Sequence, residues 1–581
     1  MSSAIEMDDG RAVTRRMGLW LRQRLLRMTT AVVLLWWMTL WWGERRVFAH
    51  SAKQCDWDSW ESWPSHAVPH RILLIADPQL VDPHTYPERP WPLSSLTFAY
   101  TDRYLKRANF YLHSRLQPDS TLFLGDLFDG GREWATAKSH SPEEQYRQYG
   151  QDFWLREYAR FSNIFLQNAL RGPLATAAAP MGRRIIASLP GNHDLGFARG
   201  IQTPVKNRFD AFFGPLNRVD VLGNHSIVSL DTVSLSAMDQ ADPQTGSSGA
   251  GDGSASASAN SHLWQPTEDF LTQAKTLRQQ AVRRAAANMN LIPPQSLKQQ
   301  PLRAGVFSLT DDIRPPHRSQ PSVPSALFPT ILLSHVPLFR PENTPCGPRR
   351  EGNPSIRIAV GYQYQNVLTP FVSSDIIKHL CAFEVVQIYS GDDHDYCEIE
   401  HSEFTGRIRE ITVKSISWAM GIRRPGVQLV SLWNPVDASK FSTANKDTPT
   451  PRDTLHNYLC LFPDQLGIFI RYAQTLALSL IILTVAAVRY SPSTALSSTI
   501  SLPDQSEPLH PATNAYLPPT ENSRDYDDWG MPDRKFKRRR GRIIPYDGSD
   551  PPRTKLRYFI RSLWEVAVPV LTFYIVLISL G

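Results

Sequence analysis

The chain has 581 residues, too many for one ordinary domain and enough for a sizeable hydrophobic core with appended segments. Its net charge of +7 does not indicate a nucleic-acid groove, because the basic residues concentrate in the first 27 residues and around 534–542, a distribution typical of charge that flanks membrane segments. The five cysteines lack zinc-finger spacing, which argues against a structural zinc site; in a lumenal domain they predict one or two disulfides and at least one free thiol, in a pairing that the sequence leaves open.

The N-terminal segment predicts a transmembrane signal anchor over 28–47, after a basic cytosolic stretch over 1–27. A cleaved signal peptide, with Val47-Phe48-Ala49 as its small-residue site, is the alternative. We favour the anchor because its Trp run fits an interfacial belt and because Arg45-Arg46 is unusual beside a cleavage site. Six Arg before the segment against two after it place the N-terminus in the cytosol and the following domain in the lumen.

Residues 67–435 then alternate apolar runs with helical patterns, which predicts a largely parallel α/β sheet. The runs that predict strands are Arg71–Ala76, Thr121–Leu124, Ile185–Leu189, Ser226–Leu230, Thr330–Leu333, Val385–Tyr389, Arg409–Ser415 and Gln428–Leu432. Helical patterns fall at about 96–116 and 149–170. The loop Pro337–Pro354 follows one of the strands and is expected to form a rim of the site.

The stretch 241–325 interrupts this pattern and is interpreted as a low-complexity surface insertion. It opens with Gly, Ser and Ala and closes with Pro, Ser and Gln, and residues 270–288 between them are compatible with an isolated polar helix. A domain boundary is the alternative, but the motifs described below continue past the stretch.

The C-terminal part predicts two further membrane spans. A polar linker over 436–468 leads to a span over 469–489, in which Arg471 would have to extend to the interface. A Pro- and Ser-rich, disordered and strongly basic stretch over 490–557 is expected in the cytosol, and a last span over 561–580 returns the C-terminus to the lumen.

Five of the apolar runs deliver oxygen or nitrogen ligands at their C-terminal ends, where α/β proteins place chemistry. These ends are Asp77-Pro78-Gln79, Gly125-Asp126, Gly191-Asn192-His193-Asp194, Ser334-His335 and Gly391-Asp392-Asp393-His394. Each taken alone reads as an ordinary turn or core residue, but five such coincidences in order are hard to obtain by chance. Carboxylate, amide and imidazole groups together suit Mn²⁺, Fe or Zn²⁺ rather than a metal that prefers thiolates.

This series resembles the blocks of the calcineurin-like metallophosphoesterases, and most closely those of the fungal cell-division-control metallophosphoesterases. Their animal counterparts are the ethanolamine-phosphate phosphodiesterases that remodel GPI anchors. The narrower match is carried by residues 76–80, 125–131, 361–367 and 390–398. The resemblance implies an α/β fold in the form of a four-layer αββα metallophosphoesterase sandwich over 67–435, here with added transmembrane helices.

The resemblance also implies two divalent metal ions with Asp126 as the bridge. One ion would take Asp77, Gln79, Asp126 and His394, and the other Asp126, Asn192, His335 and Asp392. A metal-bound hydroxide would be the nucleophile. His193 would not be a ligand; it would act as general acid to the leaving oxygen or as positive charge near the phosphoryl group. Asp129 and Asp194 would orient the ligands.

Two positions depart from the family pattern, which commonly has His where Gln79 and Asp392 stand. Both changes make the site richer in oxygen, which favours Mn²⁺ over Zn²⁺; the alternative is a weakened site. His401 is left open between a substrate contact and a strand cap. The glycosylation sequon at Asn224 abuts a predicted strand, so we do not expect it to be reliably occupied.

By resemblance, the expected function is hydrolysis of ethanolamine phosphate from a mannose of the GPI-anchor glycan in the endoplasmic reticulum membrane, which aids export of GPI-anchored proteins. The expected partners are GPI glycolipid and the membrane, without nucleic acid; the mannose and the oligomeric state are left open. The alternatives are another lumenal phosphoesterase and a non-catalytic membrane protein that binds Mn²⁺. A DNA repair nuclease is disfavoured by the predicted spans.

Overall fold

The computed structural model describes residues 28–167, 175–180, 182–239, 260–291, 325–361, 363–437, 439, 444, 448–490 and 552–579. The chain forms two compact units, which we describe separately. The larger unit comprises Met38–Tyr472 with Ile575–Gly581, and the smaller comprises Met1–Trp37 with Ala473–Tyr574.

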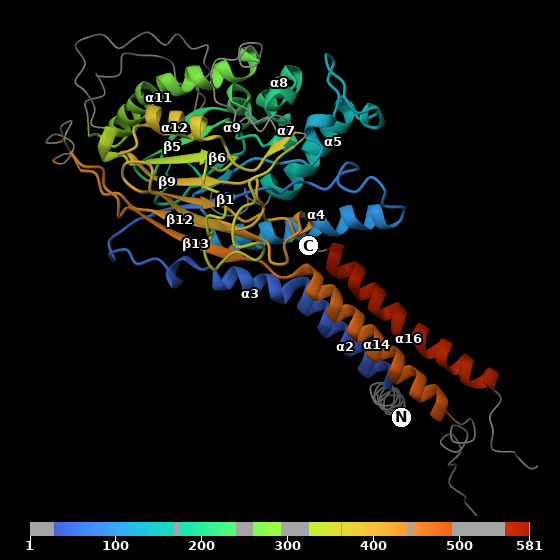
Figure 1. Ribbon diagram of the computed structural model, residues 1–581. Helices are drawn as coiled ribbons and strands as arrows, with labels where there is room; N and C mark the ends of the chain where they lie inside the picture. Colours follow the sequence, from blue (N-terminus) through green and yellow to red (C-terminus); the bar gives the residue numbers. More distant parts are fainter. Residues whose placement is uncertain are drawn as a thin grey trace, which may run out of the picture. The chain divides into compact units, whose positions relative to one another are not determined.

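Two sheets form the centre of the larger unit (Figure 1). The first has the order β13-β12-β1-β2-β3 and the second the order β10-β11-β9-β6-β5-β4. The strands of the first are β1 (His70–Ile75), β2 (Ser120–Phe123), β3 (Arg184–Ile186), β12 (Gly426–Leu432) and β13 (Leu455–Leu461). Those of the second are β4 (Arg218–Leu222), β5 (His225–Leu230), β6 (Thr330–Ser334), β9 (Val385–Ser390), β10 (Cys397–His401) and β11 (Ile408–Thr412). A small hairpin pairs β7 (Val360–Gly361) with β8 (Tyr364–Gln365).

The central strands are parallel and the edges antiparallel. β1, β2 and β3 pair in parallel, as do β5, β6, β9 and β11, whereas β12, β13, β4 and β10 pair antiparallel with their neighbours. β1 is buried almost throughout and is apolar from Ile72 to Ile75, because both faces of a central strand are covered. The eight predicted strands are all present, although β3 ends at Ile186, three residues before the predicted end.

Alternate residues of the strands face two different cores, which gives the fold its layers. Ile72 and Leu74 of β1 share a core between the sheets with Ile331 and Leu333 of β6. The intervening residues point outward, so that Leu73 joins a second core with the helices. The covering helices are α3 (Val47–Gln54), α4 (Leu93–Leu116), α5 (Gln151–Phe161), α8 (Thr203–Phe213), α11 (Ser261–Asn288) and α12 (Pro370–Leu380). Figure 1 shows α11 and α12 beside the second sheet and α3 and α4 beside the first. The predicted four-layer αββα arrangement is confirmed.

Two predictions about the segments around this fold are wrong. The linker over 436–468 contains β13, which pairs along its whole length with β12, and its Cys460 forms a disulfide with Cys55. The insertion over 241–325 contains α11, which is not an isolated polar helix. It buries Leu263, Phe270, Leu271 and Ala274, because apolar residues recur at helical spacing along one of its faces. Residues 240–259 and 292–324 lie outside the described part of the chain.

The predicted signal anchor is helical throughout. α2 (Met28–Trp41) continues through a π-helical turn over Trp42–Arg46 into α3. The small-residue site Val47-Phe48-Ala49 lies within α3, and Phe48 is fully buried in the core of the larger unit. The second disulfide joins Cys346 to Cys397, and Cys381 is the free thiol, which confirms the predicted thiol count.

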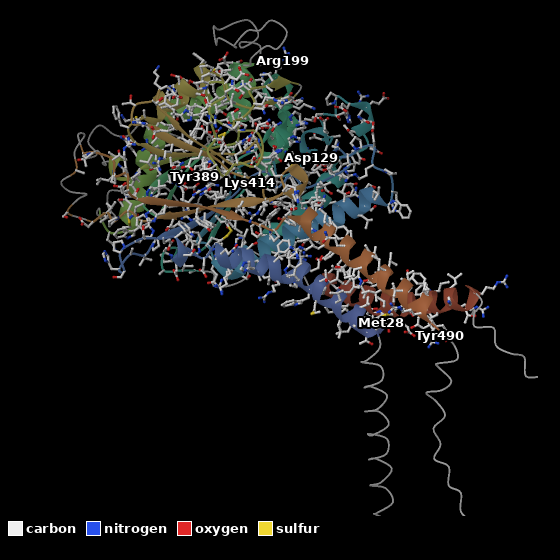
Figure 2. The ribbon with its side chains drawn as sticks, turned by 60° about the horizontal axis from the view of Figure 1, so that its bottom comes forward. Met28, Asp129, Arg199, Tyr389, Lys414 and Tyr490 are labelled. Atoms are coloured by element: carbon white, nitrogen blue, oxygen red, sulfur yellow. A yellow bond between two sulfur atoms is a disulfide. The ribbon has the colours of Figure 1, made fainter. Side chains whose placement is uncertain are left out.

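Within the described residues, two helices are long and apolar enough to cross a membrane. They are α14, whose candidate span is Gln465–Arg489, and α16, whose candidate span is Arg553–Ser579; α2, at 14 residues, is shorter. Within the smaller unit the Trp36 indole donates to the Ser479 hydroxyl at 3.0 Å and the Trp37 indole donates to the Pro569 carbonyl at 3.3 Å. Met28 and Tyr490 lie at the same end of this unit (Figure 2), so α2 and the smaller unit's part of α14 run in opposite directions.

Candidate metal centre

The polar residues that follow the parallel strands meet in one buried place. Asp77 follows β1, Asp126 follows β2 and His335 follows β6, and their ligand atoms all lie within 4.8 Å of one another. All three side chains are less than 2 % exposed. The carboxyl ends of parallel strands share one edge of a sheet, and this places residues distant in sequence together.

His335 lies at the centre of this cluster. Its Nε2 atom is 3.4 Å from Asp126 Oδ1, 3.5 Å from Asp392 Oδ1 and 3.2 Å from Asn192 Oδ1. Its Nδ1 atom is 2.7 Å from the Leu124 carbonyl oxygen, which can only accept, so Nδ1 carries the proton. In the neutral ring Nε2 then presents a lone pair to the carboxylates, which is the tautomer that a metal ligand requires.

Asn192 is oriented by a backbone group that the sequence did not reveal. It is the first residue of the short helix α7 (Asn192–Leu195) and is buried. Its Nδ2 donates to the carbonyl of Gln363 at 2.9 Å, and Gln363 Oε1 in turn accepts from Phe197 N–H at 2.7 Å. The amide oxygen of Asn192 is therefore the atom that faces His335. Gln363 has a left-handed φ of 62°, which is rare for residues other than glycine and clusters at functional sites. This signal is present in the backbone conformation and not in the sequence.

Gln79 and Asp77 present buried oxygens that have no hydrogen-bond donor in the described part of the chain. Gln79 Nε2 donates to Asp126 Oδ2 at 2.7 Å, which leaves Gln79 Oε1 without a partner. Asp77 Oδ1 accepts from Asp392 N–H at 3.1 Å, while Asp77 Oδ2 is also unpartnered. Unsatisfied buried oxygens are costly, and a cation satisfies them. The residues present therefore fit divalent metal ions.

His394 completes the set from the loop after β9. Its carbonyl accepts from Ser415 N–H at 2.9 Å, which ties this loop to the segment after β11. Burial lowers the pKa of the His394 ring despite the raising influence of Asp126 and Asp392, so the neutral form that ligates metal is favoured.

Five of the predicted ligands adopt a backbone conformation that side chains rarely take. The left-handed φ angles are 46° at Asp77, 32° at Gln79, 51° at Asp126, 70° at Asp392 and 66° at His394. Such angles cost free energy at residues other than glycine and cluster at functional sites, where the surrounding structure enforces them. The fold therefore bends each loop so that its side chain is presented to the common centre.

At two positions of the motifs there is no room for a side chain larger than that of glycine. A Cβ atom on Gly125, whose φ is +93°, would lie 2.5 Å from His335 Nδ1. A Cβ atom on Gly191 would lie 2.0 Å from Asp126 Oδ1. Glycine at both positions lets the loops after β2, β3 and β6 close on one another.

His193 stands beside the centre without entering it. Its side chain is 27 % exposed, its backbone N–H donates to Asp126 Oδ1 at 2.8 Å, and its Nδ1 is 2.7 Å from the Asp129 carbonyl and 3.3 Å from Asp129 Oδ1. Burial and Arg132 lower the pKa of His193, but Asp126 and Asp129 outweigh them and raise it to about 9. Burial raises the pKa of Asp129, but the bond to His193 and its charge lower it to about 2. The pair thus holds a protonated imidazole near neutral pH.

Asp194 ties two of the loops together, in keeping with its predicted orienting role. Its carboxylate accepts from Gly191 N–H at 2.9 Å, from Leu127 N–H at 3.0 Å and from Phe128 N–H at 3.1 Å. The loops after β2 and β3 are thereby held in register.

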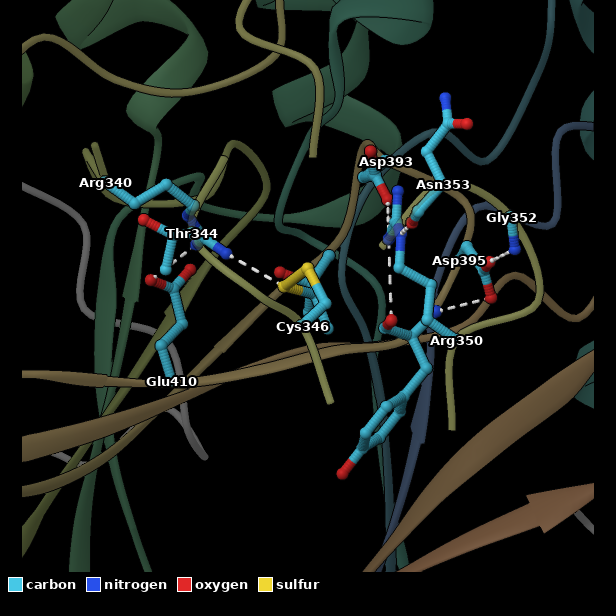
Figure 3. The surroundings of a disulfide bond; sticks show 12 residues. Arg340, Thr344, Cys346, Arg350, Gly352, Asn353, Asp393, Asp395 and Glu410 are labelled. Atoms are coloured by element: carbon cyan, nitrogen blue, oxygen red, sulfur yellow. Dashed lines mark hydrogen bonds and ion pairs between the residues drawn. A yellow bond between two sulfur atoms is a disulfide. The ribbon is translucent and has the colours of Figure 1, made fainter. Parts of the chain in front are cut away.

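The loop over 337–354 packs on the loop after β9, which carries two of the predicted ligands (Figure 3). Cys346 is joined to Cys397, and Arg350 forms an ion pair with Asp393, the residue between Asp392 and His394. Asp395 accepts from the N–H groups of residues 351 and 352 at 2.8 Å each and from Lys414 Nζ at 2.6 Å. These contacts fix the loop beside the predicted metal ligands.

His401 is a structural residue. Its Nε2 is 2.7 Å from Glu410 and its Nδ1 is 2.7 Å from Glu403, and the side chain is 1 % exposed. Of the two alternatives left open by the sequence, the structure thus favours a buried role within the sheet over contact with substrate.

Comparisons with known proteins agree with this geometry. No family model matches the chain. Cell division control protein 1 of Saccharomyces cerevisiae is 33% identical over 443 residues, which cover 75% of this chain and 70% of that protein. Metallophosphoesterase 1 of Xenopus laevis is 25% identical over 347 residues, which cover 59% of this chain and 65% of that protein. Among solved structures, a dimetal phosphatase from Danio rerio is 14% identical and covers 68% of this chain and 100% of that chain, but its TM-score of 0.29 is too low to support further inference.

Proposed function

Because the chain belongs to the Cell division control protein 1 family of calcineurin-like metallophosphoesterases, which are metal-dependent phosphoesterases, we propose that it is a two-metal phosphodiesterase that removes ethanolamine phosphate from a mannose of the GPI glycan. The observation that supports hydrolysis best is the buried cluster of Asp77, Asp126 and His335, with unpartnered oxygens directly beside it.

The site residues divide into two sets around Asp126. Asp77, Gln79, Asp126 and His394 would hold one divalent ion, and Asp126, Asn192, His335 and Asp392 the other. The ions would supply positive charge to the phosphoryl oxygens and activate water. The amide of Gln79 and the carboxylate of Asp392 make the donor set richer in oxygen, which supports Mn²⁺ as the preferred ion.

His193 provides the proton-bearing group. Asp129 holds its Nδ1, so Nε2 is the ring atom left to face substrate. A protonated ring there stabilises charge on the departing mannose oxygen and gives it a proton, which an alkoxide leaving group requires.

The substrate and the location are inferred from the resemblance together with the apolar helices. α14 and α16 support attachment to a membrane, and a lumenal larger unit would meet a lipid-borne glycan. Disulfides within the larger unit support an oxidising compartment such as the endoplasmic reticulum.

The test uses the full-length protein in detergent and in cells that lack it. Asp126→Ala should lose bound metal by elemental analysis and restore no GPI trimming in a mass spectrum of the glycans. His193→Asn should keep its metal while kcat on the glycan falls roughly 10²–10⁴-fold, the usual contribution of a general acid. If cells that lack the protein have normal GPI glycans, and the purified protein hydrolyses phosphopeptides, another lumenal phosphoesterase would be favoured. Full rescue by either variant would favour a non-catalytic protein.

A further inference from the structure

An uncovered apolar face runs along the first turns of α4 and the residues before it. Trp91, Leu93 and Leu96 are 80 %, 55 % and 46 % exposed, and Trp91 is the most exposed large hydrophobic residue in the described part of the chain. Leu93, Leu96 and Tyr100 are spaced three and four residues apart, so they share one side of the helix. Exposed apolar clusters of this kind mark interaction sites.

The same side of α4 contacts the beginning of α14. The ring of Tyr100 packs edge-to-face on Phe469, with centroids 5.4 Å apart. One turn further along α4, the Tyr104 hydroxyl donates to the Pro463 carbonyl at 2.9 Å. Because α14 is a candidate membrane span, the exposed face adjoins the place where the chain would enter the bilayer.

The metal centre is connected to the same place by a short piece of chain. Trp418 also packs on Phe469, with centroids 6.1 Å apart. Three residues earlier, the Ser415 hydroxyl donates to the Asp77 carbonyl at 2.7 Å. The start of α14 and a metal ligand are therefore joined through the segment 415–418.

The residues around this face have the composition of a membrane interface. Arg89 stacks over the ring of Tyr86 at 3.8 Å, and the Tyr86 hydroxyl donates to the Ala419 carbonyl at 3.3 Å. Trp and Tyr concentrate where a protein meets lipid headgroups, and Arg reaches the phosphates from there.

We propose that Trp91, Leu93 and Leu96 form a membrane-docking surface that inserts into the interface of the bilayer entered by α14. Its occupant is lipid, because Tyr100, on the same side of α4, packs on Phe469 in the first turns of a helix apolar enough to span a membrane. The inference depends on α14 being a span and does not depend on which phosphodiester is cleaved. It assigns α4 the task of fixing the metal centre at the membrane surface.

The test places a fluorescent probe at defined positions of the full-length protein in phosphatidylcholine–phosphatidylinositol nanodiscs. In a Cys381→Ser background, which removes the free thiol, a nitrobenzoxadiazole label is attached to Leu96→Cys. Leu155→Cys on α5 is the matched control, since Leu155 is 45 % exposed and Leu96 is 46 % exposed. Ile470→Cys, within α14, is the positive control. Spin-labelled lipids quench probes that touch the acyl region.

For an inserted apolar face, we expect the probe at residue 96 to be quenched almost as strongly as the probe at 470. Its quenching should be at least about threefold stronger than that of the probe at 155. Equal, weak quenching at 96 and 155 would overturn the proposal. So would a probe at 96 that is shielded from both lipid and aqueous iodide, which would indicate a protein partner or a second copy. Absence of quenching at 470 would also overturn it, because α14 would then not be a span.

A second measurement separates docking from hydrolysis. The triple variant with Trp91, Leu93 and Leu96 changed to Ser should hydrolyse the soluble diester bis(p-nitrophenyl) phosphate like wild type. Its apparent KM for a phosphodiester carried in vesicles should rise about threefold or more, because interfacial binding scales with buried apolar area. Equal KM values for wild type and the triple variant on vesicles would contradict the docking proposal. Asp126→Ala tests hydrolysis separately: if it loses turnover of the soluble diester while the triple variant keeps it, the proposed hydrolysis stands whatever the vesicle result.

Discussion

At the residue scale, Gly191 is predicted to be essential although it carries no ligand. Any residue can adopt its φ of −108°, so backbone conformation does not require glycine here. The requirement is steric, because a Cβ atom would lie 2.0 Å from Asp126 Oδ1 and 2.4 Å from Asp126 N. Gly191→Ala should therefore displace the carboxylate of Asp126, the proposed bridge, with loss of bound metal and at least about a hundredfold loss of kcat/KM.

Gly150→Ala is the matched control, because a Cβ atom there would meet nothing within 4 Å and its φ is −113°. Metal content by elemental analysis and diester hydrolysis are measured for both variants. Normal metal content in Gly191→Ala would contradict the prediction, because it would show that the loops after β2 and β3 can move to make room for the Cβ atom.

Glu410 gives a pH dependence of stability. Burial raises its pKa, but the charge of Arg340 and the bond from His401 lower it to about 2, against 4.5 for an unperturbed Glu. A carboxylate whose folded-state pKa is depressed stabilises the fold above its unfolded pKa, and this contribution is lost as pH falls from about 4.5 through about 2. Glu410→Gln should lower stability by about 3–5 kcal/mol at neutral pH, since Arg340 is left buried without its counter-charge.

Thermal unfolding of wild type and Glu410→Gln at several pH values checks this. The difference between the two melting temperatures should be large at pH 7 and shrink below about pH 4.5. A difference that stays constant down to about pH 3 would mean that another group accounts for the acid sensitivity.

The sequence could predict that polar side chains follow the strands, but not how their backbone holds them. Gly-Asp and Gly-Asn-His are visible as turns after apolar runs, so Asp126 and Asn192 could be placed at strand ends. Left-handed angles at Asp77 and Gln79 leave no such trace, because they are enforced by contacts with loops far along the chain. The bond from Asn192 to the Gln363 carbonyl spans 171 residues and is equally invisible.

At the element scale, the loop over 337–354 is predicted to govern metal affinity. The ion pair between Arg350 and Asp393 is buried, and Asp393 lies between two predicted ligands on the loop after β9. Arg350→Ala should weaken Mn²⁺ binding by roughly 10–100-fold, as expected for a group that orients ligands, while kcat at saturating metal changes less. Titration of activity and of bound Mn²⁺ against free Mn²⁺ measures both.

Arg407→Ala serves as its control, because Arg407 is 76 % exposed in its pair with Glu400 and such surface pairs contribute little. If both variants bind Mn²⁺ equally, the ion pair of Arg350 has no role in holding the ligands.

The sequence pattern does not reveal an element's role where it is locally ambiguous. β13 reads Leu-His-Asn-Tyr-Leu-Cys-Leu, and the polar residues of this edge strand hide its pairing with β12. The flanking low-complexity stretches favour an isolated polar helix over 270–288, whereas α11 begins at Ser261 and its buried face repeats at helical spacing. The apolar runs within β1 and β6 were predictable because a central strand is buried on both faces.

At the scale of the whole molecule, the proposed topology places the larger unit in the lumen and the stretch 490–557 in the cytosol. Two single changes of the same kind test it. Asp437→Asn creates an Asn-Ala-Ser sequon in an exposed part of the larger unit, and Asp504→Asn creates an Asn-Gln-Ser sequon in the basic stretch. Glycan should be added to the first and not to the second, as read from a shift in mass that endoglycosidase removes.

The unchanged chain is the reference for this test. Its sequon at Asn224 should stay empty in the folded protein, because Asn224 Nδ2 donates to the Asn434 carbonyl at 2.7 Å and Asn434 Nδ2 donates back at 2.9 Å. A glycan on residue 504 but not on 437 would reverse the topology and place the metal centre in the cytosol.

The bond between Cys55 and Cys460 closes nearly the entire larger unit into a covalent ring, since 405 positions separate the two cysteines. Every predicted ligand lies inside this ring, with Asp77 and Asp126 before residues 292–324 and His335 and Asp392 after them. A protease that cuts the chain there would leave two fragments that together carry all the predicted ligands and still migrate as a single band on a denaturing, non-reducing gel. Under those denaturing conditions only a reductant would part them, so the cut protein should run as two bands once thiol is added.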